Sequence, residues 1–172
     1  TSIMAGQGTA GLEIAEQCPG LDAVVVPVSG GGLISGVSTA VKALSPGTKV
    51  YGAEPAALPR YTVSLAAGKP TRVEQKKTLA DALVAPIPGE LCFPCVAANV
   101  DGFADVEDTD MFRAMKLLLT EGKILAEPSS AIGMGAVLAG QLPVRKEDKV
   151  CFLISGGSVA LDQLDRLKDI QI

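Results

Sequence analysis

Two short glycine-rich segments hold the residues of this sequence that are best suited to binding an anion. Residues 29–32 read SGGG after the apolar run VVVPV, and residues 155–157 read SGG after KVCFLI. A helix that follows such a loop begins with N–H groups that lack intrahelical acceptors, and its dipole adds partial positive charge. Glycine lets these N–H groups approach a phosphate without side-chain hindrance, and Ser29 adds a hydroxyl.

The spacing of the first loop narrows the choice of phosphate ligand. It does not complete G-x-G-x-x-G, because position 35 is serine, and no G-K-[ST] follows, so dinucleotides and NTP hydrolysis are disfavoured. Taken alone, the glycine triplet is equally consistent with a tight turn where a helix packs closely on a sheet, and Ser155 with a helix N-cap. Together, the two loops could span a ligand that has a phosphate at one end and a polar ring atom at the other.

Composition removes several other functions. The 172 residues contain no histidine, so no Ser-His-Asp triad, Cys-His dyad or histidine metal cluster can form within the chain. A net charge of -4 without a basic run disfavours nucleic acid, and no apolar stretch reaches the ~18 residues of a membrane span. No signal peptide is evident. Cys18, Cys92, Cys95 and Cys151 are interpreted as free thiols of a cytoplasmic protein.

Strand and helix patterns alternate along the chain. Strands are expected at residues 22–28, 48–53, 102–106 and 149–154, and helices at 8–17, 32–44, 58–67, 90–98, 109–121, 128–139 and 159–168. Asp108 or Thr109 is expected to cap the helix at 109–121, Pro94 to interrupt the helix at 90–98, and residues 69–88 to form mostly loop.

This alternation predicts a single α/β domain over residues 1–172. Strands joined by helices form a mainly parallel sheet covered by helices on both faces, which is a three-layer architecture. The aliphatic, aromatic-poor composition suits such a buried sheet. Ligands of open parallel sheets bind at the carboxyl ends of the strands, where both glycine loops are expected to lie.

Six segments, in this order, resemble the serine racemase and serine/threonine dehydratase family, which are pyridoxal-phosphate enzymes of fold-type II (tryptophan synthase β-like). The matching segments are AGQGTAGLEI (5–14), DAVVVPVSGGGLISG (22–36), KVYGAEP (49–55), TLADAL (78–83), ILAEPSSAIG (124–133) and LISGGS (153–158). The ordered set is more specific than any one motif, and it is closer to serine racemase than to the other branches.

The resemblance implies a role for each glycine loop. The loop at 29–33 would wrap the cofactor phosphate with its backbone amides, and Ser155 would hydrogen-bond the pyridine nitrogen, where a neutral hydroxyl suits β-elimination and racemisation over transamination. Ala82 stands where the family usually has a glycine beside the cofactor ring, which would strain the alanine if φ were positive there. The cofactor-binding residues implied in this way are Ser29, Gly30, Gly31, Gly32, Leu33, Ala82 and Ser155.

The family's divalent cation site is altered in this sequence. The resemblance implies that Glu54, the carbonyl of Leu58 and an acid at position 60 would hold Mg²⁺ or Ca²⁺, but position 60 is arginine, which cannot ligate a metal. An alternative hypothesis is that Arg60 pairs with Glu54 and replaces the cation. Glu127 is interpreted as the cap of the helix that starts at Pro128.

The resemblance also shows what this chain lacks. The family's Schiff-base lysine lies in an upstream S-F-K-x-R-G stretch, and its substrate loop reads S-x-N-H-G; neither stretch occurs here, so no catalytic residue is assigned. The chain is therefore interpreted as the C-terminal part of a homodimeric racemase or dehydratase that acts on serine or threonine, inactive by itself. Two alternatives remain: a non-catalytic binding or regulatory module on the same scaffold, and a nucleotide-dependent α/β enzyme of another kind.

Overall fold

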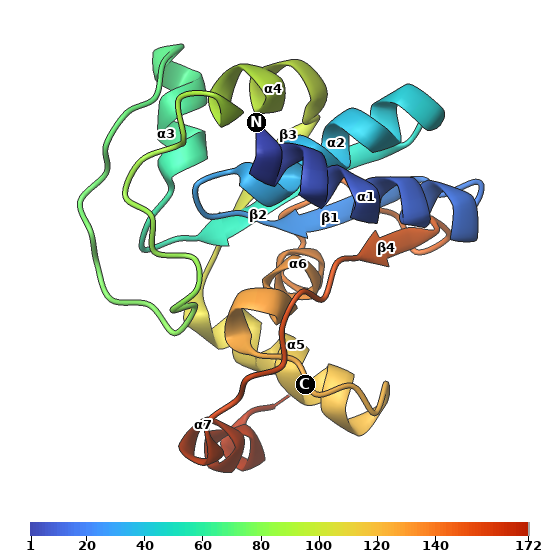
Figure 1. Ribbon diagram of the computed structural model, residues 1–172. Coiled ribbons are helices and arrows are strands. Elements are labelled where there is room, and N and C mark those ends of the chain that lie inside the picture. The colour runs from blue at the N-terminus through green and yellow to red at the C-terminus, as the bar shows by residue number, and fades with distance from the viewer. Residues whose placement is uncertain (172) are drawn as a thin grey trace.

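A four-stranded parallel sheet forms the centre of the protein (Figure 1). The computed structural model describes residues 1–171, and residue 172 lies outside the description. Strands β1 (Ala23–Pro27), β2 (Lys49–Pro55), β3 (Gly102–Val106) and β4 (Val150–Phe152) lie in the order β3-β2-β1-β4, and every neighbouring pair is parallel. The predicted α/β class, with its parallel sheet flanked by helices, is confirmed, and each of the four strands lies within or close to its expected range.

Helices cover both faces of the sheet (Figure 1). Helices α1 (Ser2–Gln17), α2 (Gly32–Leu44) and α4 (Cys92–Asn99) lie over one face, and α5 (Asp108–Thr120) and α6 (Pro128–Leu138) over the other. Helix α3 (Arg60–Ala67) follows β2, and α7 (Leu161–Arg166) with a 3₁₀ turn (Leu167–Asp169) packs beside α5. None of the described helices combines the length and the apolar character that crossing a lipid bilayer requires.

The central strand β1 is buried on both faces because its side chains alternate between two apolar layers. Val24 and Val26 pack in the layer that contains Ile34 of α2, whereas Val25 packs in the layer that contains Ile132 of α6. A continuous run of β-branched residues is what a parallel strand covered by helices on both sides requires. This double burial fixes the carboxyl end of β1, and therefore the start of the glycine loop at residue 29.

Helix α1 begins at Ser2, six residues before the expected start. Its inner face is built from small residues that approach α2 too closely for the apolar periodicity to show. A Cβ on Gly36 of α2 would lie 2.3 Å from the carbonyl oxygen of Met4 and 2.5 Å from the nitrogen of Gly8. The two backbones are therefore in direct contact along this face.

Helix α3 begins at Arg60, two residues after its expected start, and three further elements differ in detail from the expectation. Helix α5 begins at Asp108 with Glu107 as N-cap, because the Asp108 carboxylate accepts hydrogen bonds from Thr78 Oγ1 at 2.7 Å and the Leu79 N–H at 3.1 Å instead of capping its own helix. Pro94 does not interrupt α4, since it lies in the first turn, where its missing N–H removes no helical bond. Helix α7 is shorter than expected and continues into the 3₁₀ turn.

Candidate functional site

One pocket of about 220 Å³ lies at the carboxyl end of β1 and the start of α2. All seven residues predicted to contact a cofactor line this pocket, together with Pro27 and Leu83. The structure thus brings the loop at 29–33, Ala82 and Ser155 together from three distant parts of the chain.

A larger hollow, of about 660 Å³, lies at the opposite end of the sheet, where β1 and β2 begin. Its charged groups already have partners: Lys49 Nζ lies 3.0 Å from Asp101, and Arg145 Nη2 lies 2.9 Å from Asp148. Ligands of parallel sheets bind at the carboxyl ends of the strands, so we place the functional site in the smaller pocket.

The glycine loop presents a run of N–H groups without protein acceptors. Within residues 1–171, the N–H groups of residues 29–33 donate to no other protein group. The Gly30 carbonyl accepts hydrogen bonds from the Tyr61 hydroxyl at 3.0 Å and from the Gly89 N–H at 2.9 Å. Because the peptide is planar and trans, the Gly31 N–H points away from these donors.

The same loop forms the start of α2. Gly31 is the N-cap residue, with φ 100°, and the 13-residue helix carries no acidic side chain in its first turn. The free N–H groups and the positive end of the helix dipole therefore both attract an anion at the start of α2. This donor set fits a phosphate group.

The other lining residues are held by serines at the start of α6. The Ala82 N–H donates to Ser129 Oγ at 3.2 Å, and the exposed Ser155 hydroxyl lies 3.4 Å from that of the buried Ser130. Ala82 does not have a positive φ, so alanine is unstrained at this position. Ser129 and Ser130 were not singled out from the sequence as site residues; the available signal was the PSS run at a helix start.

Ser29 and Glu127 also hold segments around the pocket. Ser29 Oγ accepts a hydrogen bond from the Ala85 N–H at 3.3 Å, which leaves its hydroxyl hydrogen available to a ligand. Glu127 occupies the N-cap position of α6 as expected, but its side chain makes no cap bond there. Its carboxylate instead accepts from the Ser158 N–H at 3.0 Å, so it holds the segment that follows Ser155.

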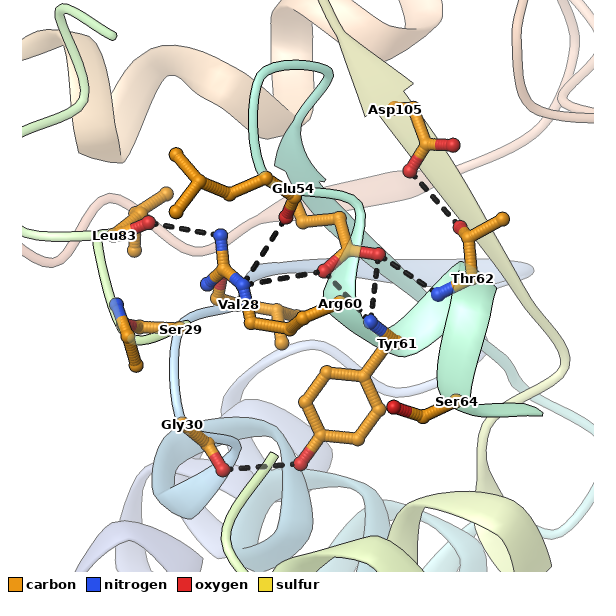
Figure 2. A network of polar contacts seen from close by, with 12 residues as sticks. Val28, Ser29, Gly30, Glu54, Arg60, Tyr61, Thr62, Ser64, Leu83 and Asp105 are labelled. Carbon is orange, nitrogen blue, oxygen red and sulfur yellow. Dashed lines mark hydrogen bonds and ion pairs between the residues drawn. The ribbon is translucent and has the colours of Figure 1, made fainter. Parts of the chain in front are cut away.

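Close to the glycine loop, Glu54 and Arg60 form a fully buried ion pair (Figure 2). Arg60 Nε lies 3.7 Å from Glu54 Oε2, so the pairing hypothesis is confirmed. The Tyr61 N–H donates to both carboxylate oxygens at 3.0 Å, and the Thr62 N–H donates to Oε1 at 2.9 Å. The carboxylate thus receives backbone donors from the first turn of α3.

Burial of Glu54 predicts a pH-dependent stability. Burial raises the pKa of the Glu54 carboxyl to about 7 from 4.5, although the Tyr61 and Thr62 N–H donors and the Arg60 charge oppose the rise. The folded protein then retains a proton that the unfolded chain loses. We therefore expect the free energy of unfolding to fall by up to about 3 kcal/mol between pH 4.5 and 7, measured by urea denaturation.

Glu54→Gln is the control for this measurement, because glutamine does not titrate. Burial also raises the pKa of the neighbouring Asp105 carboxyl, so a smaller slope of the same sign remains in the variant. A variant that loses as much stability as the wild type over this interval would show that Glu54 is not the group that titrates.

Comparisons with known proteins agree with the phosphate-binding character of the pocket. A family model described as "Pyridoxal-phosphate dependent enzyme" matches residues 1–156. The chain is 44% identical over 165 residues to L-threonine ammonia-lyase of Thermotoga maritima, covering 96% of this chain and 41% of the relative. It is 40% identical over 168 residues to serine racemase of Dictyostelium discoideum, covering 96% of this chain and 52% of the relative.

Solved structures show the same likeness in three dimensions. Maize serine racemase superposes with a TM-score of 0.87 at 39% identity, covering 96% of this chain and 51% of that one. The processed form of threonine deaminase isoform 2 from Solanum lycopersicum superposes with a TM-score of 0.90 at 32% identity, covering 97% and 49%. The chain spans about half the length of the relatives it matches. By its sequence and its fold, the chain belongs to the family of pyridoxal-phosphate dependent enzymes.

Proposed function

We propose that the loop at residues 29–33 binds the phosphate of pyridoxal 5'-phosphate. The observation that carries the proposal is the run of N–H groups without protein acceptors at the start of α2. Ser29 adds a hydroxyl, and Leu33 adds the last of the five amides. A dianion is the ligand for which such a positive, donor-only surface is best suited.

The far side of the pocket would face the cofactor ring. Ser155 would hydrogen-bond the pyridine nitrogen, with Ser130 fixing the direction of its hydroxyl, and the backbone at Ala82 would lie beside the ring. Bound pyridoxal phosphate supplies an electron sink that weakens the bonds at the substrate Cα. A neutral hydroxyl does not hold the ring nitrogen protonated as a carboxylate would, which favours β-elimination or racemisation over transamination.

For the complete enzyme we propose the activity of a serine racemase or an L-serine/L-threonine dehydratase. The support is the similarity to serine racemases and threonine ammonia-lyases, of which this chain would form the C-terminal part. Because the family's Schiff-base stretch does not occur in these 172 residues, the chain alone would be inactive.

The assembly and location of the complete enzyme are part of the same proposal. We propose a homodimer, for which the exposed apolar side chains of Ile3 and Leu12 on α1 offer contact surface. We also propose a cytoplasmic location, because the four cysteines are free thiols in the structure.

An activity assay tests this proposed reaction. We expect the complete enzyme, loaded with pyridoxal phosphate, to form the α-keto acid or the D-amino acid from serine or threonine, whereas the 172-residue chain forms neither. Absence of both products from the complete enzyme would exclude the reaction. Turnover by the chain alone would exclude the proposal that the catalytic groups lie outside these 172 residues.

A further inference from the structure

The residues around Glu54 do not fit a divalent cation. The positive charge of Arg60 lies among the oxygen atoms that such an ion needs: its Nε is 3.7 Å from Glu54 Oε2 and donates to the Leu58 carbonyl at 3.1 Å. In the described part of the chain, residues 1–171, there is no group of three or more His, Cys, Asp or Glu side chains that could hold a metal. The acid that the family pattern places at position 60 is replaced by a fixed positive charge.

Figure 2 shows the Arg60 guanidinium between Glu54, Val28 and Leu83. Its Nη1 donates to the Val28 carbonyl at 3.0 Å, its Nη2 donates to the Leu83 carbonyl at 2.9 Å, and its Nε faces Glu54 at 3.7 Å. The side chain has no solvent exposure. A planar, permanently charged fork can bridge three carbonyl groups in this way, whereas an ammonium group cannot match the same geometry.

The two carbonyl groups held by Nη1 and Nη2 belong to two walls of the pocket that come from distant parts of the chain. Val28 directly precedes the loop at 29–33, and Leu83 directly follows Ala82. The next residue of α3, Tyr61, donates its hydroxyl to the Gly30 carbonyl. The first turn of α3 therefore fixes the glycine loop and joins it to the segment across the pocket.

We propose that the permanent positive charge of Arg60 takes the structural role of a divalent metal ion, so that the pocket forms without a metal ion. Arg60 is a positioning residue in this proposal, because it contacts the backbone that carries the pocket and not the ligand. The role of Arg60 in positioning the pocket rests on the proposed function, whereas the replacement of a metal ion by Arg60 does not.

Metal content and thermal unfolding of the full chain test the proposal. We expect the wild-type protein to contain no stoichiometric Mg²⁺, Ca²⁺ or Mn²⁺ by elemental analysis after equilibration with each ion. We also expect its Tm to be unchanged by EDTA or by Mn²⁺. A stoichiometric divalent ion in the wild type, or a fall in Tm on adding EDTA, would overturn the proposal whether or not pyridoxal phosphate binds.

Arg60→Asp provides the complementary variant, because it places a carboxylate six residues after Glu54, in the family spacing. We expect a lower Tm without metal and a gain of about 5–10 °C with Mn²⁺ at a hundredfold excess over Kd. Arg72→Asp makes the same charge change in an exposed loop and should show no Mn²⁺ response. A folded Arg60→Asp protein without a Mn²⁺ response contradicts the proposal; if that variant does not fold, the wild-type measurements decide.

Arg60→Lys separates positioning from a merely stabilising role. It keeps the charge but loses the fork, so the amide resonances of residues 28–33 and 82–84 should shift together in two-dimensional NMR spectra. Arg72→Lys should leave both segments unchanged. Shifts confined to α3 in Arg60→Lys would show that the guanidinium does not join the two walls.

Discussion

Gly31→Ala should weaken pyridoxal-phosphate binding and destabilise the protein by about 4 kcal/mol. A φ of 100° costs a residue with a Cβ about 1–2 kcal/mol. The added Cβ would also lie 1.8 Å from the Tyr61 hydroxyl oxygen, which must move and release the Gly30 carbonyl. Overpacking of this kind adds about 1–3 kcal/mol, and the lost hydrogen bond about 1 kcal/mol.

Urea denaturation and equilibrium dialysis with pyridoxal phosphate measure the two effects. Gly140→Ala is a matched control, since Gly140 has φ 67° but no atom lies within 4 Å of the place that its new methyl group would occupy. That variant should lose only about 1 kcal/mol and bind the cofactor normally. A Gly31→Ala protein that is as stable as this control, or that binds the phosphate with wild-type affinity, contradicts the geometry of the loop.

Arg60→Met should lower the free energy of unfolding by about 3–5 kcal/mol at neutral pH. The carbonyls of Val28, Leu58 and Leu83 would lose their donors inside the protein, and Glu54 would lose its counter-charge. Removing one partner of a buried ion pair is strongly destabilising, because the remaining carboxyl group must either stay charged without a partner or take up a proton. The loss should be measured by urea denaturation.

A double-mutant cycle with Glu54→Gln isolates the pair itself. The double variant should be more stable than the sum of the single losses predicts, with a coupling energy of about 1–3 kcal/mol. Arg113→Met is the matched surface control: Arg113 lies 3.3 Å from Asp110 but is 42% exposed, so its loss should cost at most about 1 kcal/mol. Equal effects at both arginines would show that the buried pair does not hold this part of the fold.

The sequence predicted the strands and the site loops because their signals are local. The run VVVPV is apolar and β-branched over the length of one strand, and the glycine loop follows it directly. The start of α1 could not be predicted in the same way. Its contact with α2 depends on Gly36 meeting the backbone of Met4 and Gly8, and such small-residue contacts leave no hydrophobic period.

In the candidate site, too, some features could be predicted from the sequence and others depend on packing between distant segments. The pairing of Glu54 with Arg60 was inferred from the family resemblance, in which an acid stands at position 60, but the reach of the guanidinium to Val28 and Leu83 depends on how three separate segments pack. Ser129 and Ser130 were missed for a similar reason. Serines at a helix start usually serve the helix itself, whereas here they bond to Ala82 and Ser155 across the fold.

Two-dimensional ¹H–¹⁵N NMR of the full chain, titrated with pyridoxal 5'-phosphate and separately with pyridoxal, shows whether residues 29–33 bind the phosphate group. Phosphate bound at the start of α2 should move the amide protons of residues 29–33 downfield, because these N–H groups gain a charged acceptor. Pyridoxal, which lacks the phosphate, should leave them nearly unchanged. Equal shifts with both ligands, or phosphate-dependent shifts that avoid residues 29–33, would contradict the account.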